Sequence, residues 1–434
     1  MLGAVAGASL VLLGTLVSCV YVPPGPKYPC PDRPKLFYPC RCLQGSDIGV
    51  TLHCQNANLA SLSIAFANVA SNKLRVESLT ISSSTFSRLY GGLLYALDVK
   101  KLVVEDTPLK SIEPQTFLGV NRSLEELHLV NTHLSFFPKE AFEILGKLSY
   151  LNVDGHRLSS FPAGSLSGLI SENLERISLV NGDLTDLAVE TLSVCKKLKR
   201  VDLHGNKFKV LKKNQFKGLR NVETLDLSHN AIAKIDGSHL SDLNKLSNCN
   251  LSHNAITEIT RGAFARNTVL RSLNLNHNKL RKIDSNSFRG MRFIRRLYMA
   301  DNEISEVGRD TFGAVSRIGI IDLARNKLKK IDFQMFAKLQ YAEKIDVSDN
   351  FVTEIQKLAF KDLYLVHVNL SHNAISKIEP GAFENCVNIT VLDMSFNKIS
   401  EFVPKVFDEL SYANELQLSY NNLTDLSKVN EFFG

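Results

Sequence analysis

Apolar and polar positions follow a pattern that returns fifteen times along this chain, about every 24 residues. A full copy has apolar residues at its first, fourth, sixth and eleventh positions and asparagine at its ninth, as in Val222, Leu225, Leu227, Ile232 and Asn230. A Phe or Leu follows ten positions after the asparagine. The alternation around the fourth to sixth positions predicts a short strand with one buried face in each copy.

The asparagine position divides the chain into two halves. It falls at Ser84, Thr107, Thr132, His156, Gly182, Asn206, Asn230, Asn254, Asn278, Asn302, Asn326, Asn350, Asn373, Asn397 and Asn421. A buried carboxamide both donates to and accepts from the backbone, so the unbroken run from Asn206 to Asn421 predicts a ladder of side-chain hydrogen bonds. The first five copies carry other residues, which predicts a less uniform N-terminal half with a gap at Gly182.

A fixed period of this length indicates a solenoid, with one strand of a parallel sheet in each turn. The apolar residues ten positions after the asparagine slot form a second buried row: Leu94, Phe117, Phe142, Leu166, Leu192, Phe216, Leu240, Phe264, Phe288, Phe312, Phe336, Phe360, Phe383 and Phe407. Because the strand side packs more closely than this aromatic side, we expect a curved horseshoe with the sheet on its concave face and a mostly irregular convex side. Residues that point outward from the strands form an extended surface of the kind solenoids present to partners.

Both ends of the chain carry information about its compartment. The apolar opening predicts a secretory signal peptide over residues 1–19, with a signal anchor or a bacterial lipoprotein signal as alternatives. A Pro-rich lead-in and a cysteine cap are expected over residues 20–68, and the repeats over residues 69–434. The last repeat is incomplete, with neither a second cysteine cap nor an apolar tail for a membrane span or lipid anchor. We therefore expect the chain to be incomplete.

Four cysteines stand close together before the repeats, at Cys30, Cys40, Cys42 and Cys54. In an exported chain they indicate a disulfide framework that caps the first turn, although their spacing does not fix the pairing. A zinc site is the alternative. The other cysteines that follow occupy apolar positions of the repeats and are expected to be buried thiols.

The cap followed by 24-residue repeats resembles the extracellular leucine-rich repeat family of animals, from about residue 30 to the end. This resemblance implies an α/β leucine-rich repeat solenoid and bonds joining Cys30 with Cys42 and Cys40 with Cys54. The long uniform array is most similar to chaoptin-, artichoke- and connectin-like proteins and to the vertebrate acid-labile subunit. That likeness implies a secreted or surface role in adhesion, in the matrix or as a carrier.

Surface residues add two candidate features. Five sequons predict N-glycosylation at Asn121, Asn250, Asn369, Asn388 and Asn422. The net charge of +7 gathers around one turn. There, Lys196, Lys197, Lys199, Arg200, Lys212 and Lys213 are candidates to bind a sulfated glycosaminoglycan, with ordinary solvated charge as the alternative. A second cluster runs from Arg289 to Arg296. Export argues against nucleic acid as a partner.

No residue set predicts catalysis or a cofactor. His229, His253 and His277 recur at the repeat period and should stack, which favours a scaffold role over a pH sensor or a metal site. The repeated Ser-His pairs lack the third group of a nucleophilic triad. We therefore predict a secreted, non-enzymatic protein that binds an extracellular protein ligand in cell adhesion or matrix organisation. The alternative is the ectodomain of an innate-immune or signalling receptor whose membrane and intracellular parts are missing.

Overall fold

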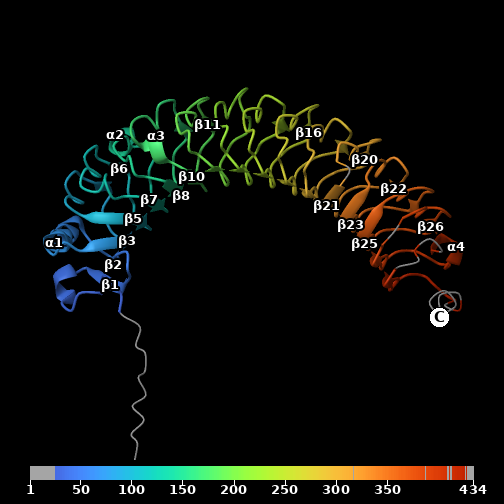
Figure 1. Ribbon diagram of the computed structural model, residues 1–434, viewed down its shortest axis with the longest axis horizontal. Helices are drawn as coiled ribbons and strands as arrows, with labels where there is room; N and C mark the ends of the chain where they lie inside the picture. Colours follow the sequence, from blue (N-terminus) through green and yellow to red (C-terminus); the bar gives the residue numbers. More distant parts are fainter. Residues whose placement is uncertain are drawn as a thin grey trace, which may run out of the picture.

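The computed structural model describes residues 25–315, 317–386, 388–407, 410, 413–425 and 427. The predicted signal peptide over residues 1–19 lies outside these. The described chain forms a horseshoe in which the strands line the inner, concave face (Figure 1). The predicted solenoid of stacked parallel strands is therefore confirmed.

The described residues place 17 strands in the concave sheet. In spatial order these are β1 (Cys40–Gly45), β2 (Val50–Gln55), β3 (Arg75–Ser82), β5 (Asp98–Glu105), β7 (Glu126–Val130), β8 (Tyr150–Asp154), β10 (Arg176–Val180), β12 (Arg200–Asp202), β13 (Thr224–Asp226), β15 (Asn248–Asn250), β17 (Ser272–Asn274), β19 (Arg296–Tyr298), β21 (Arg317–Asp322), β23 (Tyr341–Asp346), β25 (Tyr364–Asn369), β27 (Val391–Asp393) and β28 (Glu415–Gln417). Only β1 runs antiparallel to its neighbour.

The pairing register follows the repeat period. Leu225 lies opposite Cys249, which lies opposite Leu273, and all three side chains are buried. Leu225 and Leu273 occupy the apolar position between two outward residues, so the period-two alternation sets which side faces the core. The buried Cys249 behaves as a small apolar residue there, and burial raises its pKa.

The asparagine ladder joins each turn to the one before it. The Nδ2 group of Asn278 donates to the carbonyls of Leu251, at 2.9 Å, and Leu275, at 3.0 Å, while its Oδ1 accepts from the Ile256 N–H at 3.0 Å. The same set of bonds recurs at all ten positions from Asn206 to Asn421. The carboxamides thus satisfy backbone groups that the turn would otherwise bury without partners.

The convex side holds the phenylalanine row and more regular structure than the sequence indicated. Rings of Phe312 and Phe336 stack at 5.9 Å, and those of Phe360 and Phe383 at 5.3 Å. Behind the main sheet, two-residue parallel strands pair between adjacent turns. These are β4 (Arg88–Leu89), β6 (Ser111–Ile112), β9 (Ser160–Phe161), β11 (Asp186–Leu187), β14 (Lys234–Ile235), β16 (Glu258–Ile259), β18 (Lys282–Ile283), β20 (Glu306–Val307), β22 (Lys330–Ile331), β24 (Glu354–Ile355) and β26 (Lys377–Ile378).

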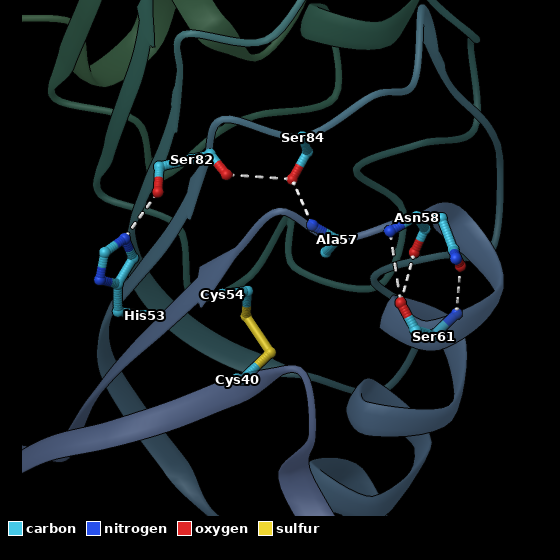
Figure 2. The surroundings of a disulfide bond; sticks show 8 residues. All are labelled: Cys40, His53, Cys54, Ala57, Asn58, Ser61, Ser82 and Ser84. Carbon is cyan, nitrogen blue, oxygen red and sulfur yellow. Dashed lines mark hydrogen bonds between the residues drawn. A yellow bond between two sulfur atoms is a disulfide. The ribbon is translucent and has the colours of Figure 1, made fainter.

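The N-terminal cap is built from β1, β2, the 3-10 helix η1 (Pro34–Phe37) and the helix α1 (Leu59–Ser71). Disulfides join Cys30 to Cys42 and Cys40 to Cys54, the pairing that the family resemblance implies. The second bond links opposite residues of β1 and β2 (Figure 2). These strands cover the interior of the first turn.

Helix α1 was not anticipated. Asn58 caps it by accepting from the Ser61 N–H, and the Ser61 hydroxyl in turn accepts from the Asn58 N–H (Figure 2). Leu62, Phe66 and Val69 bury one face of the helix. The helix crosses the boundary between cap and repeats that the sequence placed at residues 68 and 69.

Single helical turns occur at α2 (Lys139–Phe142), α3 (Ile170–Asn173) and α4 (Pro404–Phe407). Among the described residues, no helix combines the length and apolar character that crossing a bilayer requires.

The early turns replace the ladder with other groups. The Ser84 hydroxyl accepts from the Ala57 N–H (Figure 2). Thr107 Oγ1 accepts from the Ser84 N–H in the same way, so hydroxyls replace the carboxamide as acceptors in these turns. The expected gap at Gly182 is filled. The buried His156 ring occupies the space where a side chain at position 182 would lie, and its Nδ1 accepts from the Leu158 N–H at 3.2 Å.

Candidate binding surface

The concave face carries one outward column of side chains that runs through every repeat. Strand register places these residues side by side in the order Thr80, Val103, His128, Asn152, Ser178, Asp202, Asp226, Asn250, Asn274, Tyr298, Asp322, Asp346, Asn369, Asp393 and Gln417. Each strand of this column except the last, β28, pairs in parallel with a strand on either side. The column is therefore continuous along the horseshoe.

Hydrogen bonds fix several polar members of this column, among them Asp226, Asn250, Asp346 and Asn369. Asp226 Oδ1 accepts from the Ser228 N–H and hydroxyl, and Asp226 Oδ2 accepts from the Asn250 carboxamide at 2.9 Å. The same arrangement recurs between Asp346 and Asn369, at 3.3 Å. The surface is therefore held in place before any partner binds.

Acidic residues in the second half of the column differ in proton affinity. Burial raises the pKa of Asp322, and the neighbouring Asp346 carboxylate raises it further. Burial also raises the pKa of Asp346, but hydrogen bonds from Ser348 and the Lys344 ammonium outweigh it, so this pKa lies below its ordinary value. Asp346 therefore holds its proton less tightly than the neighbouring Asp322.

A second column lies just beyond the strands, at the residue before each asparagine. The rings of His229, His253 and His277 stack there at 4.1 Å between centroids, as their recurrence at the repeat period predicts. Burial lowers the pKa of His253, and the imidazoles on either side lower it further. Each of these residues has a φ of 52–54°, in the left-handed region.

The same column continues with other planar groups. Arg325 makes a two-pronged contact with Asp301, with both N···O distances at 2.8 Å. Farther along, His372, Phe396 and Tyr420 stack at 4.2 Å, and Tyr420 is 75% exposed. Among the described residues, no group of histidine, cysteine or acidic side chains is arranged to hold a metal ion.

The lysine-rich turn is more balanced in charge than its sequence indicated. Residues 196–220 contain a single acid, Asp202. The structure, however, brings acids of the preceding turn beside the lysines. Lys199 pairs with Glu175 at 3.0 Å, and Lys212 pairs with Asp186. Lys207 and Lys217 pair with Asp183 and Glu190, both at 2.6 Å.

The remaining candidates of this turn do not gather on one face. Lys196 and Lys197 donate to the Ser193 carbonyl and the Asn173 carboxamide oxygen. Arg200 begins β12 on the concave side, whereas Lys212 and Lys213 follow the asparagine and lie toward the convex side. The six candidate residues are therefore spread around the circumference of one turn.

The sequons fall on three kinds of site. Asn250 and Asn369 lie in the central concave column, and their carboxamides donate to Asp226 and Asp346. Asn121 and Asn388 are half-buried in the turns that precede strands. Asn422 is exposed.

Comparison with known proteins agrees with this architecture. The leucine-rich repeat family model matches residues 98–169, 172–232, 196–256, 244–304 and 340–399. Podocan of Mus musculus is 29% identical over 190 residues, which make up 43% of this chain and 29% of podocan. Toll-like receptor 3 of Boselaphus tragocamelus is 32% identical over 123 residues, or 28% of this chain and 14% of the receptor.

A solved structure gives the same fold over a greater length. The chain superposes on one from the Toll–Spatzle complex of Drosophila with a TM-score of 0.71 and 21% identity, over 87% of this chain and 50% of that one. The chain thus spans less than a third of these curated relatives and half of the Toll chain. These matches support an extracellular type of repeat protein without singling out the chaoptin-like or acid-labile-subunit-like branch. With its family model matched over more than half of its length, on a horseshoe with the corresponding buried rows, this chain belongs to the leucine-rich repeat family.

Proposed function

We propose that this chain is a non-enzymatic binding protein, secreted or held at the cell surface, that acts in cell adhesion or matrix organisation. The observation that carries the proposal is the continuous concave column, several of whose polar groups are fixed by hydrogen bonds within the protein. An extended, preorganised surface lowers the entropy cost of binding a large partner.

An extracellular protein is the partner class we favour. The Toll chain that shares this fold is in a complex with Spatzle, and podocan shares its repeats over part of its length. The disulfide-bonded cap suits an oxidising compartment. We further propose that residues 1–19 are a cleaved signal peptide, that the cap spans residues 20–68 and the repeats residues 69–434, and that the five sequons carry glycans.

The second candidate function is the ectodomain of an innate-immune or signalling receptor. The similarity to Toll and to Toll-like receptor 3 favours it. Extraction of the native protein from its source tissue separates the two. Recovery in the membrane fraction, as a larger chain that only detergent releases, would establish the receptor, whereas recovery in the soluble or matrix fraction supports the first proposal.

Glycosaminoglycan binding by the lysine-rich turn is a weaker proposal. Its lysines at positions 199 and 212 already face acids, which reduces the charge available to a sulfated chain. Heparin-affinity chromatography tests it, with the wild type run beside a variant in which all six candidate residues are serine. Elution of both at the same salt concentration would remove this turn from consideration.

The test of the main proposal is binding of the purified secreted protein to cells, to deposited matrix and to a panel of secreted proteins. Tyr298→Ala removes the tyrosine side chain of the concave column. Phe333→Ala is the matched control, because Phe333 is an exposed aromatic outside the concave strands. We expect only Tyr298→Ala to weaken binding; failure of the wild type to bind any of these targets would refute the proposal.

A further inference from the structure

A groove lined by arginines lies at the edge of the concave sheet where β17, β19, β21 and β23 begin. Its larger hollow, of about 480 Å³, is lined by Arg295, Arg296, Arg317 and Tyr341 among others. A smaller hollow of about 240 Å³ adjoins it and is lined by Val269, Arg271, Phe293 and Arg295. Arg295 lines both, so the two form one feature, the arginine groove, which spans four turns.

A glycine opens the floor of this groove. Gly319 lies between Arg295 of the preceding turn and Glu343 of the next, and its N–H donates to the Arg295 carbonyl at 2.9 Å. A Cβ atom at this position would lie 2.8 Å from that carbonyl oxygen and 3.6 Å from Glu343 Oε2. Since the neighbouring turns carry long side chains in this column, the missing side chain leaves a recess between them.

The guanidinium groups around the recess have no acidic partners. Within the described part of the chain, Arg271, Arg295, Arg296 and Arg317 form no ion pair, in contrast to Lys199 and Lys212. Arg317 instead stacks over the Tyr341 ring at 4.7 Å, and that ring stacks on Tyr364 at 5.4 Å. Stacking fixes the plane of the guanidinium and leaves its N–H donors directed outward for a carboxylate.

The apolar lining defines the rest of the ligand. Phe293 is 62% exposed and Val269 39%, and Ile318 and Ile320 contribute to the larger hollow. Exposed aromatic and arginine side chains around a recess are the composition of binding hot spots between proteins. Glu343 also lines the groove, so a polysaccharide charged at every position would meet a like charge there, whereas a segment with apolar residues between its carboxylates can place an apolar residue beside Glu343.

We propose that the arginine groove binds an acidic segment of a protein partner. Carboxylates of that segment pair with Arg295, Arg296 and Arg317, and an adjacent apolar side chain packs against Phe293. The proposal rests on the proposed function as a protein-binding solenoid and adds the place and the chemistry of the contact.

The experiment measures binding of a fluorescein-labelled peptide of sequence EEFEEF by fluorescence anisotropy at physiological salt. The test variant is Arg295→Ser with Arg296→Ser and Arg317→Ser. The control variant is Lys196→Ser with Lys197→Ser and Lys213→Ser, which removes the same charge from the lysine-rich turn. Circular dichroism verifies that both variants are folded.

We expect the arginine variant to raise the dissociation constant by more than about tenfold, because it removes charge-assisted, two-pronged contacts. The lysine control should change it by less than about twofold, as expected for distant surface charge. A peptide with glutamine in place of glutamate should bind weakly to all three proteins.

Several results would overturn the proposal. One is the absence of saturable binding to the wild type, and another is equal weakening by both variants, which would show that net charge alone acts. Tighter binding of a heparin hexasaccharide through the same three arginines would assign the groove to a polyanion instead. Loss of the peptide interaction with retained binding to cells or matrix would refute only the groove and leave the proposed function standing.

Discussion

The contact between His156 and Gly182 gives a quantitative test of how the irregular turns are held together. Gly182→Ala adds one methyl group at a point no more than 2.5 Å from three atoms of the His156 ring, whereas ordinary contacts begin at 3.4 Å. The ring is 2% exposed, so relieving the clash requires it to move by about 1 Å within a closely packed interior.

Two costs follow from that movement. Overpacking a closed site costs about 1–3 kcal/mol. Displacing the ring also breaks the bond from the Leu158 N–H to His156 Nδ1, and an unpaired buried N–H costs about 1–3 kcal/mol. We therefore expect Gly182→Ala to lower the free energy of unfolding by about 2–6 kcal/mol.

A double-mutant cycle with His156→Ala isolates the contact. His156→Ala alone leaves the Leu158 N–H unpaired and a cavity behind, but in its presence the added methyl has room. The two changes should therefore be less harmful together than their sum, with a coupling of about 1–3 kcal/mol. Urea unfolding followed by circular dichroism measures all four proteins. Gly182→Ala with wild-type stability, or strictly additive effects, would show that His156 does not fill this position.

Four further predictions follow. Asn278→Ala should cost about 1–3 kcal/mol, because it leaves the Leu251 carbonyl and the Ile256 N–H unpaired; an unchanged thermal melt would contradict the ladder. Burial lowers the pKa of His156 to about 4, below its ordinary value of 6.5. The stability that the neutral, buried ring contributes is therefore complete above pH 6.5 and is lost as the pH falls toward 4, because the unfolded chain then binds a proton that the folded chain does not. Over that range the free energy of unfolding of the wild type should fall by up to about 3 kcal/mol more than that of His156→Asn. Urea melts in which the two proteins lose stability in parallel with pH would refute this. Joint replacement of Cys40 and Cys54 by serine opens a loop with a sequence separation of 14 and should cost about 3 kcal/mol, seen as faster proteolysis near the N-terminus; an unaltered cleavage rate there would count against the cap. In an NMR titration, His253 should titrate below the ordinary histidine value of 6.5, because burial and the two neighbouring imidazoles lower its pKa; a midpoint at or above that value would exclude the stacked arrangement.

The repeat pattern was sufficient to predict the strands, their register and the buried rows. Each depends on residues whose roles repeat: an apolar strand residue such as Leu225 recurs in all fifteen copies, and an asparagine such as Asn230 in ten. The cap helix was missed because its signal is local and occurs once: Asn58 and Ser61 cap a segment in which Leu62, Phe66 and Val69 share one face. The two-residue convex strands have no apolar alternation long enough to detect.

The binding surface was harder to predict, because lateral neighbours in a solenoid are one turn apart in sequence. Lys199 and Lys212 belong to a stretch of sequence whose single acid is Asp202. Their partners in the structure, Glu175 and Asp186, precede them by 24 and 26 residues and belong to the turn before. The packing of the His156 ring into the space beside Gly182 could not be predicted for the same reason. Each residue, taken alone, is only a departure from asparagine at its position of the repeat. Likewise, the arginine groove requires Arg295, Gly319 and Tyr341 from three successive turns.

The pairing of every turn with the one before it has a consequence for how such a gene changes. Asn278 bonds only within its own turn and to the preceding one, and β17 pairs only with β15 and β19. Duplication or loss of a whole 24-residue unit in this regular half leaves each surviving turn with equivalent neighbours. Recombination between repeats in the coding sequence can therefore lengthen or shorten the horseshoe by whole turns, and each resulting protein still folds. The number of turns, and with it the reach of the concave face, is open to selection independently of the fold.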